Sequence, residues 1–334
     1  MRGERAPVAV PEVTLNSGHK MPLIALGTVA SDLPPTEALA AILVYAIEVG
    51  YRHFDTAALY GSEESLGLAM AEALRRQVIK SRDELFITSK LWCTDADPSL
   101  VLLALKKSLG RLGLEYLDMY LIHWPARLKE GTRGSNITKE SILEFDMKGT
   151  WKAMEECSNL GLAKSIGVSN FGPKNLSQIL QICTIPPAVN QAHTHARSYW
   201  VEMHVAWRQK KLRGFCKERG IHVSAWSPLA ANGARWGSKA VMDSPILKEI
   251  AQGRGTTVAQ VALRWVHEQG SCVIVKSFNK ERMKENLKIL EWEKAITEDE
   301  LEKINRIPPH QGVPGHELVT ENGPGYRSVD ELWE

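Results

Sequence analysis

Short runs of apolar and β-branched residues alternate along this chain with longer segments whose apolar residues recur every three or four positions. The short runs predict strands, and the longer segments predict amphipathic helices. Strands are predicted near 25–28, 51–56, 85–90, 117–122, 164–169, 187–191, 221–226 and 272–276, and helices near 34–49, 63–76, 98–110, 149–160, 173–182, 207–219, 257–268 and 280–290. This alternation favours an α/β fold in which a parallel sheet closes as a (β/α)8 TIM barrel, with residues 1–334 as one domain.

Some segments depart from the alternation. Residues 13–24 place two short apolar runs on either side of Asn16-Ser17-Gly18, which predicts an N-terminal β-hairpin. Three long segments that contain glycine lie between predicted elements or after the last predicted helix. They are 127–148, 230–242 and 308–334. Loops of this length in a compact domain are usually functional or disordered. The first two follow predicted strand ends, where a barrel has its active face, although mobile surface loops are the alternative.

Composition excludes several function classes. Among the 334 residues, 41 are basic and 39 acidic, and no basic run is long enough to indicate a nucleic-acid or membrane-surface partner. No apolar run is long enough to cross a membrane, and the first residues lack the apolar core of a secretory signal. The five cysteines form no CxxC pair, so neither a disulfide framework nor a zinc site is indicated. We therefore expect a cytoplasmic, monomeric protein that acts on a small molecule.

Four ionisable residues fall at the ends of three consecutive predicted strands. Asp55 and Tyr60 follow the second barrel strand, Lys90 ends the third, and His123 ends the fourth. Each residue type taken singly is more often structural, because tyrosine packs, aspartate caps turns and histidine is often satisfied in a core. Lysine, however, is almost never buried unless it is paired, and Asp55 is a possible partner. Since the carboxyl ends of barrel strands share one face, the four side chains are predicted to converge there.

Six segments in sequence order resemble the signature segments of the aldo-keto reductases. They are GYRHFDTAALYGSE (50–63), SKLW (89–92), LIHWP (121–125), GVSNF (167–171), AWSPL (225–229) and VKSFNKERMKEN (275–286). The segment WGSKAVMDSPILKEIA and the tail SVDELWE further resemble plant NADPH-dependent members of secondary metabolism, around codeinone reductase, chalcone reductase and deoxymugineic acid synthase. The resemblance implies NADPH-dependent reduction of a small-molecule aldehyde or ketone to an alcohol.

The resemblance also implies roles for the four strand-end residues. Carbonyl reduction needs a proton donor, and Tyr60 would be that acid, with a pKa lowered by the nearby Lys90 cation. Asp55 would pair with Lys90 and compensate its burial. His123 would bind and orient the carbonyl oxygen, and Trp124 would form an aromatic wall of the substrate pocket.

The cofactor site is predicted at the last strand. No GxGxxG or GxxxxGK[ST] segment is present, so Rossmann and P-loop sites are not indicated. A helix start with Lys276 and Arg282 suits a phosphate monoester, although such a basic helix start is often only solvated surface. With the resemblance, NADP(H) is favoured over NAD(H). The implied cofactor-binding residues are Ser169, Asn170 and Gln191 at the carboxamide, Trp226 stacked on the nicotinamide, Ser227 and Leu229 along the pyrophosphate, Lys276, Ser277, Asn279 and Arg282 at the 2′-phosphate, and Glu285 and Asn286 near the adenine. Thr28, Val29, Asp55 and Phe278 are implied as further cofactor-binding residues.

One segment departs from the resembling family. Relatives run from VNQ directly into VEM, whereas here Ala192–Trp200 lies between Gln191 and Val201. We expect the sixth strand to end at Gln191 and the insertion to bulge outward, which puts the cofactor role of Gln191 in question. His193 and His195 in this segment lack a third convergent ligand, so no metal site is predicted.

Two other functions fit parts of the pattern. A non-catalytic NADP(H)-binding module would keep the cofactor residues, and its activity would be impaired by the 192–200 insertion. A barrel hydrolase would use Asp55 and His123 with a metal ion, but the sequence lacks a cluster of histidine and carboxylate ligands around them.

Overall fold

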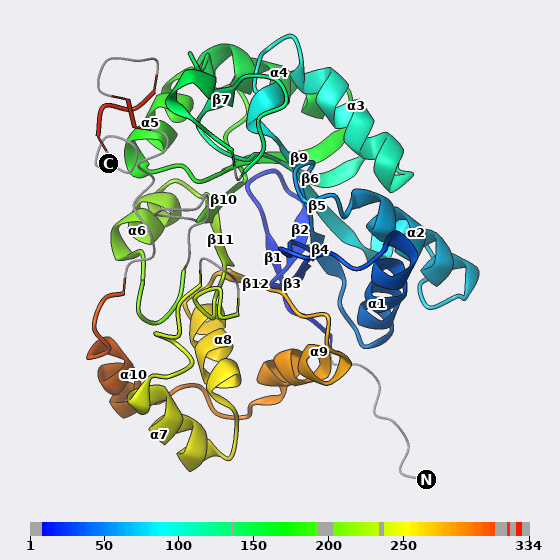
Figure 1. The fold of residues 1–334 in the computed structure, drawn as a ribbon. Coiled ribbons are helices and arrows are strands. Elements are labelled where there is room, and N and C mark those ends of the chain that lie inside the picture. Colours follow the sequence, from blue (N-terminus) through cyan, green and yellow to red (C-terminus); the bar gives the residue numbers. More distant parts are fainter. Residues whose placement is uncertain are drawn as a thin grey trace.

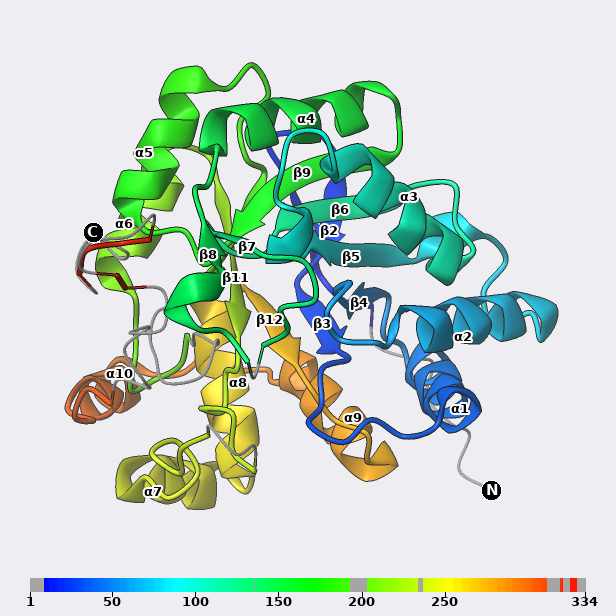
Figure 2. The ribbon, with the colours of Figure 1, turned by 45° about the horizontal axis from the view of Figure 1, so that its top comes forward.

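The chain folds as a closed parallel barrel surrounded by helices (Figure 1). The structure is a computed structural model that describes residues 9–134, 136–192, 203–233, 237–310, 319–320 and 325–328. Seen after a 45° turn, the strands line the centre and the helices lie outside them (Figure 2). The predicted (β/α)8 fold is therefore confirmed.

The barrel strands follow the predicted order, with boundaries within about two residues of those expected from the apolar runs. Every neighbouring pair is parallel, and hydrogen bonds close the strands in the order β10–β11–β12–β3–β4–β5–β6–β9. These strands are β3 (Ile24–Gly27), β4 (His53–Asp55), β5 (Phe86–Leu91), β6 (Leu117–Ile122), β9 (Ala163–Ser169), β10 (Val189–Ala192), β11 (His222–Trp226) and β12 (Cys272–Val275).

The helices pack their apolar faces on the outside of the barrel, where the largest buried cluster joins helix and strand residues. Caps fix several helix starts, such as Asp146, whose carboxylate accepts from the Gly149 N–H. The helices in chain order are α1 (Thr36–Glu48), α2 (Glu63–Arg75), α3 (Val101–Leu112), α4 (Met147–Asn159), α5 (Pro173–Ile182), α6 (Lys210–Glu218), α7 (Pro245–Arg254), α8 (Val258–Glu268), α9 (Lys280–Leu287) and α10 (Glu298–Asn305).

Two of these helices, α7 and α10, are absent from the sequence prediction. Local signals mark both of them. Ser244 caps α7 directly before Pro245. Thr297 and Glu300 form a capping box at the start of α10. Both helices lie outside the one-strand, one-helix repeat, so a prediction built on that repeat passes over them.

The N-terminal hairpin closes the lower end of the barrel, which confirms the prediction for residues 13–24. β1 (Glu12–Thr14) pairs antiparallel with β2 (Lys20–Pro22). Leu15 and Met21 are buried with apolar side chains of the barrel interior. The Asn16 side-chain amide also donates to the Pro187 carbonyl at 2.9 Å. The open face of the barrel is therefore the opposite one, at the carboxyl ends of the strands.

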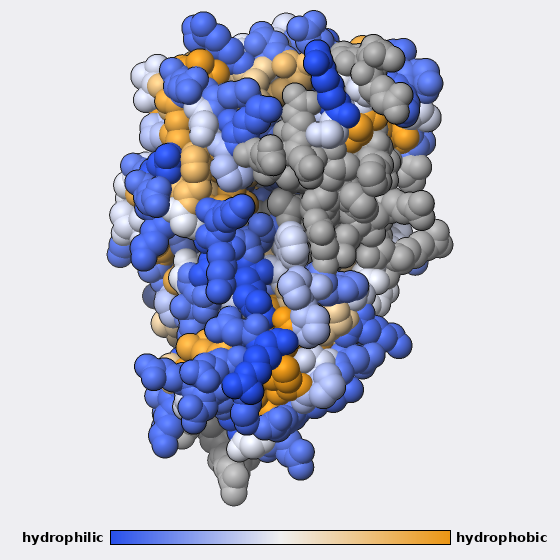
Figure 3. Space-filling model, turned by 90° about the vertical axis from the view of Figure 1, so that its left-hand side faces the viewer, coloured by the Kyte–Doolittle hydropathy of each residue, from blue (hydrophilic) through white to orange (hydrophobic). Residues whose placement is uncertain are grey.

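The predicted loop 127–148 contains a small antiparallel ribbon, β7 (Arg127–Leu128) and β8 (Ile142–Leu143), above that open face. Among the described residues no helix has the length and apolar character needed to span a membrane. The described part of the face in Figure 3 is mainly hydrophilic, with scattered apolar residues.

Candidate active site

A buried ion pair lies at the carboxyl ends of β4 and β5. Asp55 is the last residue of β4 and pairs with Thr88 of β5. Lys90 lies two residues beyond Thr88, so its side chain points to the same side of the sheet. The Lys90 Nζ atom donates to Asp55 Oδ1 at 2.7 Å and to the Thr56 carbonyl at 2.9 Å, and both charged residues are 0% exposed. Burial at this depth requires such a pairing.

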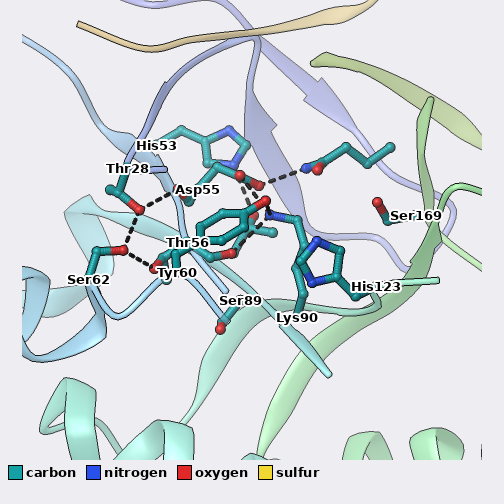
Figure 4. Close-up of polar contacts among 12 residues, drawn as sticks. Thr28, His53, Asp55, Thr56, Tyr60, Ser62, Ser89, Lys90, His123 and Ser169 are labelled. Atoms are coloured by element: carbon teal, nitrogen blue, oxygen red, sulfur yellow. Dashed lines mark hydrogen bonds and ion pairs between the residues drawn. The ribbon is translucent and has the colours of Figure 1, made fainter. Parts of the chain in front are cut away.

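Tyr60 and His123 complete the cluster drawn in Figure 4. The Tyr60 hydroxyl lies 3.4 Å from Lys90 Nζ, and the Lys90 ammonium lies 4.8 Å from the centre of the tyrosine ring. The imidazole of His123 meets that ring edge to face, with 5.5 Å between centroids. The structure therefore brings together the four residues that the strand-end pattern predicts.

The pKa of Tyr60 is raised well above its ordinary value, first by burial and second by the Asp55 carboxylate. The prediction of a lowered Tyr60 pKa is therefore wrong, because burial and the Asp55 carboxylate both disfavour the phenolate. Burial also lowers the pKa of Lys90, against the opposing effect of Asp55. The Tyr60 phenol, like any tyrosine with an ordinary pKa of about 10, is protonated at neutral pH, as a proton donor must be.

Three amide and hydroxyl side chains lie at the neighbouring strand ends. The Gln191 side-chain amide donates to Asp55 Oδ2 at 2.7 Å, so it contacts the ion pair directly. The Asn170 side-chain amide donates to the His123 carbonyl at 2.5 Å and to Ser169 Oγ at 3.2 Å. Asn170 Oδ1 is buried and has no hydrogen-bond partner among the described residues. A buried acceptor of this kind calls for a donor from outside the described chain.

An apolar wall lies next to His123. Trp124 is buried and packs with Trp92, Leu128 and Ile142, and its role as a pocket wall stays a prediction. The Trp92 ring lies 5.2 Å from His123, and its indole N–H donates to the Thr132 carbonyl. Tyr326, from the C-terminal segment, packs against the same cluster. The sequence alone predicted no functional role for Trp92 or for Tyr326.

A cleft of about 420 Å³ runs from Trp226 to Arg282, beside the ends of β3, β11 and β12. Of the residues predicted to bind a cofactor, Val29, Trp226, Ser227, Leu229, Lys276 and Arg282 line it. Ser227 has φ +48°, a left-handed backbone conformation that non-glycine residues adopt rarely and mostly at turns or functional sites.

Other predicted cofactor residues have internal partners. Asn279 caps α9, because its Oδ1 accepts from the Arg282 N–H at 2.9 Å. Asn286 is buried beside the Tyr51 hydroxyl, with which it interacts. Ser277 accepts from the Asn279 N–H, Phe278 lies under the Lys276 ammonium, and Glu285 offers its carbonyl to the Gln260 amide. The hydroxyl of Thr28 is fully buried and turned away from the cleft into a hydrogen-bond chain described below.

Comparison with known proteins decides the family. A family model described as "Aldo/keto reductase family" matches residues 23–308. The chain belongs to the aldo/keto reductase family. It is accordingly an oxidoreductase, and the resemblance seen in the sequence is confirmed.

Several curated proteins similar to this aldo/keto reductase come from plants. "Protein REDOX 2" of Catharanthus roseus is 53% identical over 328 residues, with 98% of each chain covered. "NADPH-dependent codeinone reductase 1-4" of Papaver somniferum is 51% identical over 325 residues, covering 97% of this chain and 98% of the relative. Among solved structures, an aldo-keto reductase of Bombyx mori in complex with NADP has a TM-score of 0.80 at 32% identity. It covers 96% of this chain and all of its own.

In this reductase no group of three or more metal-ligating side chains occurs within the described residues. His193 and His195 lie outside them. Both carboxylate oxygens of Asp55 accept hydrogen bonds, one from Lys90 and the other from Gln191.

The described residues on either side of 193–202 contact neighbouring points on β11. β10 continues one residue beyond the predicted end, because Ala192 still pairs with Ala225. The chain is described again at Met203, whose N–H donates to the Trp226 carbonyl at 3.1 Å. Residues 193–202 lie outside the described part, so the predicted outward bulge is not placed. The two ends are anchored to consecutive residues, so a shorter connection fits between them.

Deletion of 192–200, which joins Gln191 to Val201, is expected to leave the fold intact and to strengthen NADPH binding or activity. Loop shortening changes closure entropy by well under a few kcal/mol. Trp226 and Gln191 lie at neighbouring strand ends, beside the segment that is removed. Thermal melts and NADPH titrations of both chains measure the two effects. A deletion variant that melts far lower or binds NADPH worse than the full chain would show that the segment is integral to the barrel.

Proposed function

We propose that the protein reduces an aldehyde or ketone to an alcohol with NADPH, using Tyr60 as the proton donor. The contacts of Lys90 carry the proposal, because one fully buried ammonium touches both the Asp55 carboxylate and the Tyr60 hydroxyl. A phenol that is protonated at neutral pH, with a cation beside the charge that develops on it, suits proton transfer to a carbonyl oxygen.

The residues present fit an NADP(H) cofactor. Lys276 and Arg282 line one cleft without an ion-pair partner among the described residues, and the pKa of Lys276 is lowered first by burial and second by Arg282. Two cations so close together favour a bound dianion such as a 2′-phosphate. At the other end, the buried acceptor Asn170 Oδ1 has no donor within the described part of the chain, and a carboxamide NH2 would supply one. The Bombyx mori relative was solved with NADP.

Bound NADPH would supply the hydride to the carbonyl carbon. The protein's own contribution is at the oxygen. Tyr60 donates its proton there, and Lys90 stabilises the phenolate that is left. Asp55 and Gln191 hold Lys90 in place through hydrogen bonds to the two carboxylate oxygens. His123, packed against Trp92 and Tyr60, orients the carbonyl.

We further propose that the substrate is a bulky apolar carbonyl compound. The residues Trp92, Trp124, Leu128, Ile142 and Tyr326 form an apolar cluster beside His123, and ligand pockets are lined mainly by aromatic and aliphatic side chains of this kind. Relatives named "Rhazimal reductase 2" (54% identical) and "NADPH-dependent codeinone reductase 1-4" (51% identical) are named for alkaloid carbonyl compounds. NADPH oxidation followed at 340 nm with small and with polycyclic carbonyl compounds tests this directly. A lower KM for the polycyclic compounds supports it, and no turnover of any carbonyl contradicts the proposed function.

Cofactor choice is tested by Arg282→Ala. Loss of a charge-assisted contact to phosphate costs about 1.5–3 kcal/mol, so the Kd for NADPH should rise by roughly 10- to 150-fold while that for NADH barely changes. Lys280→Ala is a matched control, because the Lys280 ammonium lies 4.7 Å from the Tyr45 ring centre and does not line the cleft. Fluorescence titration measures all four constants. Equal weakening of both cofactors by Arg282→Ala would place the 2′-phosphate elsewhere.

A further inference from the structure

Three buried hydroxyl groups form a hydrogen-bonded chain behind the catalytic cluster (Figure 4). Thr28 Oγ1 donates to the Asp55 carbonyl at 3.1 Å. Ser62 Oγ lies 2.7 Å from Thr28 Oγ1 and 2.9 Å from Thr56 Oγ1. All three side chains are 0% exposed. The chain therefore connects β3, the end of β4 and the start of α2 without contact with solvent.

Counting protons fixes the direction of this chain. Each hydroxyl has one proton to donate, and that of Thr28 goes to the Asp55 carbonyl. Ser62 must then donate to Thr28, and Thr56 must donate to Ser62, because every other assignment leaves one of the three bonds without a proton. Hydrogen bonds that run in one direction polarise one another, so the chain is cooperative and loses more than one bond when a member is removed.

Ser62 serves this chain instead of the helix next to it. It occupies the N-cap position of α2, where a serine hydroxyl ordinarily accepts from a backbone N–H of the first turn. Here Ser62 makes no side-chain cap hydrogen bond. Its hydroxyl instead joins the two ends of the 56–62 loop, which carries Tyr60. The contact thus closes the loop that holds the proton donor.

The same chain also fixes the acceptors of Lys90. The Asp55 carboxylate and the Thr56 carbonyl both accept from Lys90 Nζ. On the other side, the Asp55 carbonyl and the Thr56 hydroxyl belong to the hydroxyl chain. Movement of this dipeptide would change the distance from Lys90 to Tyr60, which is 3.4 Å.

We propose that Thr28 and Ser62 are positioning residues that hold Tyr60 and Lys90 in register through the Thr56–Ser62–Thr28 hydroxyl chain. This rests on the proposed function, in which Tyr60 is the acid. It assigns to the Thr28 side chain a different role from the cofactor contact that the sequence resemblance implies.

Thr28→Val, which keeps the shape and removes the hydroxyl, tests the proposal against Thr28→Ser, which keeps the hydroxyl. A displaced acid costs roughly 10- to 100-fold in rate, so Thr28→Val should lower kcat by that factor and Thr28→Ser should stay near wild type. The Kd for NADPH should be unchanged in both. Thr150→Val is the control, because Thr150 is equally buried but lies in α4. Ser62→Ala should repeat the loss of kcat and serves if Thr28→Val does not fold.

Several results would overturn the proposal. Weaker NADPH binding with an intact kcat at saturation would make Thr28 a cofactor ligand. Equal losses in Thr28→Val and Thr28→Ser, or the same loss in Thr150→Val, would indicate packing. Hydrogen exchange of the 57–61 amides, read by mass spectrometry, should rise in Thr28→Val and not in Thr28→Ser. This readout needs no turnover, so it tests the hydroxyl chain even if the wild-type protein reduces no carbonyl. A wild-type protein that reduces no carbonyl would contradict the proposed function and not the hydroxyl chain. Unchanged exchange in both Thr28→Val and Ser62→Ala would contradict the chain.

Discussion

Replacing Tyr60 with phenylalanine is expected to lower kcat by about 10²- to 10⁴-fold, the usual contribution of a positioned acid. Only the hydroxyl is removed. The ring keeps its edge-to-face contact with His123 and its place over the Lys90 ammonium. Tyr60 does not line the cleft that runs from Trp226 to Arg282, so the Kd for NADPH should stay near the wild-type value.

The matched control is Tyr116→Phe. Its hydroxyl donates to Asp83, remote from the catalytic cluster, so kcat should not change. Steady-state turnover of an aldehyde and fluorescence titration of NADPH measure both variants. Wild-type turnover by Tyr60→Phe would remove Tyr60 from the mechanism, and an equal loss in Tyr116→Phe would point to a general effect of tyrosine replacement.

Replacing Lys90 with methionine is expected to affect both stability and activity. Methionine is also long and unbranched, but it leaves the fully buried Asp55 carboxylate with the Gln191 amide in place of an ammonium. Breaking a buried ion pair from one side costs about 3–5 kcal/mol. At roughly 2–4 °C per kcal/mol for domains of 150–250 residues, the Tm should fall by at least about 5 °C. Turnover should be lost as well, because the Tyr60 phenolate no longer has a cation beside it.

The double variant Asp55→Asn with Lys90→Met separates the two effects. Removing both charges removes the unpaired carboxylate, so much of the lost Tm should return while turnover stays absent. Thermal melting and aldehyde turnover of both single variants and the double variant complete the cycle. A double variant that melts below Lys90→Met, or that recovers turnover, would contradict the ion-pair account.

The catalytic cluster could be predicted from sequence because a parallel barrel brings the residues at the carboxyl ends of its strands to one face. Asp55, Lys90 and His123 each end a strand or follow one directly, and parallel strands deliver such residues to one face. The apolar runs similarly predicted the barrel strands to within about two residues, since period and length distinguish a short buried strand from a helix. These inferences need only local pattern and one topological rule.

Side-chain direction could not be predicted in the same way. The resemblance implies that Thr28, Asn279 and Asn286 bind the cofactor. In the structure, the Thr28 hydroxyl contacts Ser62, Asn279 Oδ1 accepts from the Arg282 N–H, and Asn286 interacts with the Tyr51 hydroxyl. The polar atoms of each side chain could bond either to a ligand or to a neighbouring group of the protein, and the partner depends on tertiary packing. The direction of the Tyr60 pKa shift could not be predicted either, because the sequence indicates a nearby cation but not the depth of burial.

In the proposed reaction, hydride passes from NADPH to a carbonyl at the cluster of Tyr60, Lys90, Asp55 and His123. A single-turnover experiment with NADPH deuterated on the transferring face of C4 tests it most directly. We expect one deuterium on the carbinol carbon of the alcohol, formed as fast as the cofactor is oxidised, and a far slower transfer in Tyr60→Phe. Bound NADPH that is never oxidised, or an alcohol formed without deuterium, would contradict it.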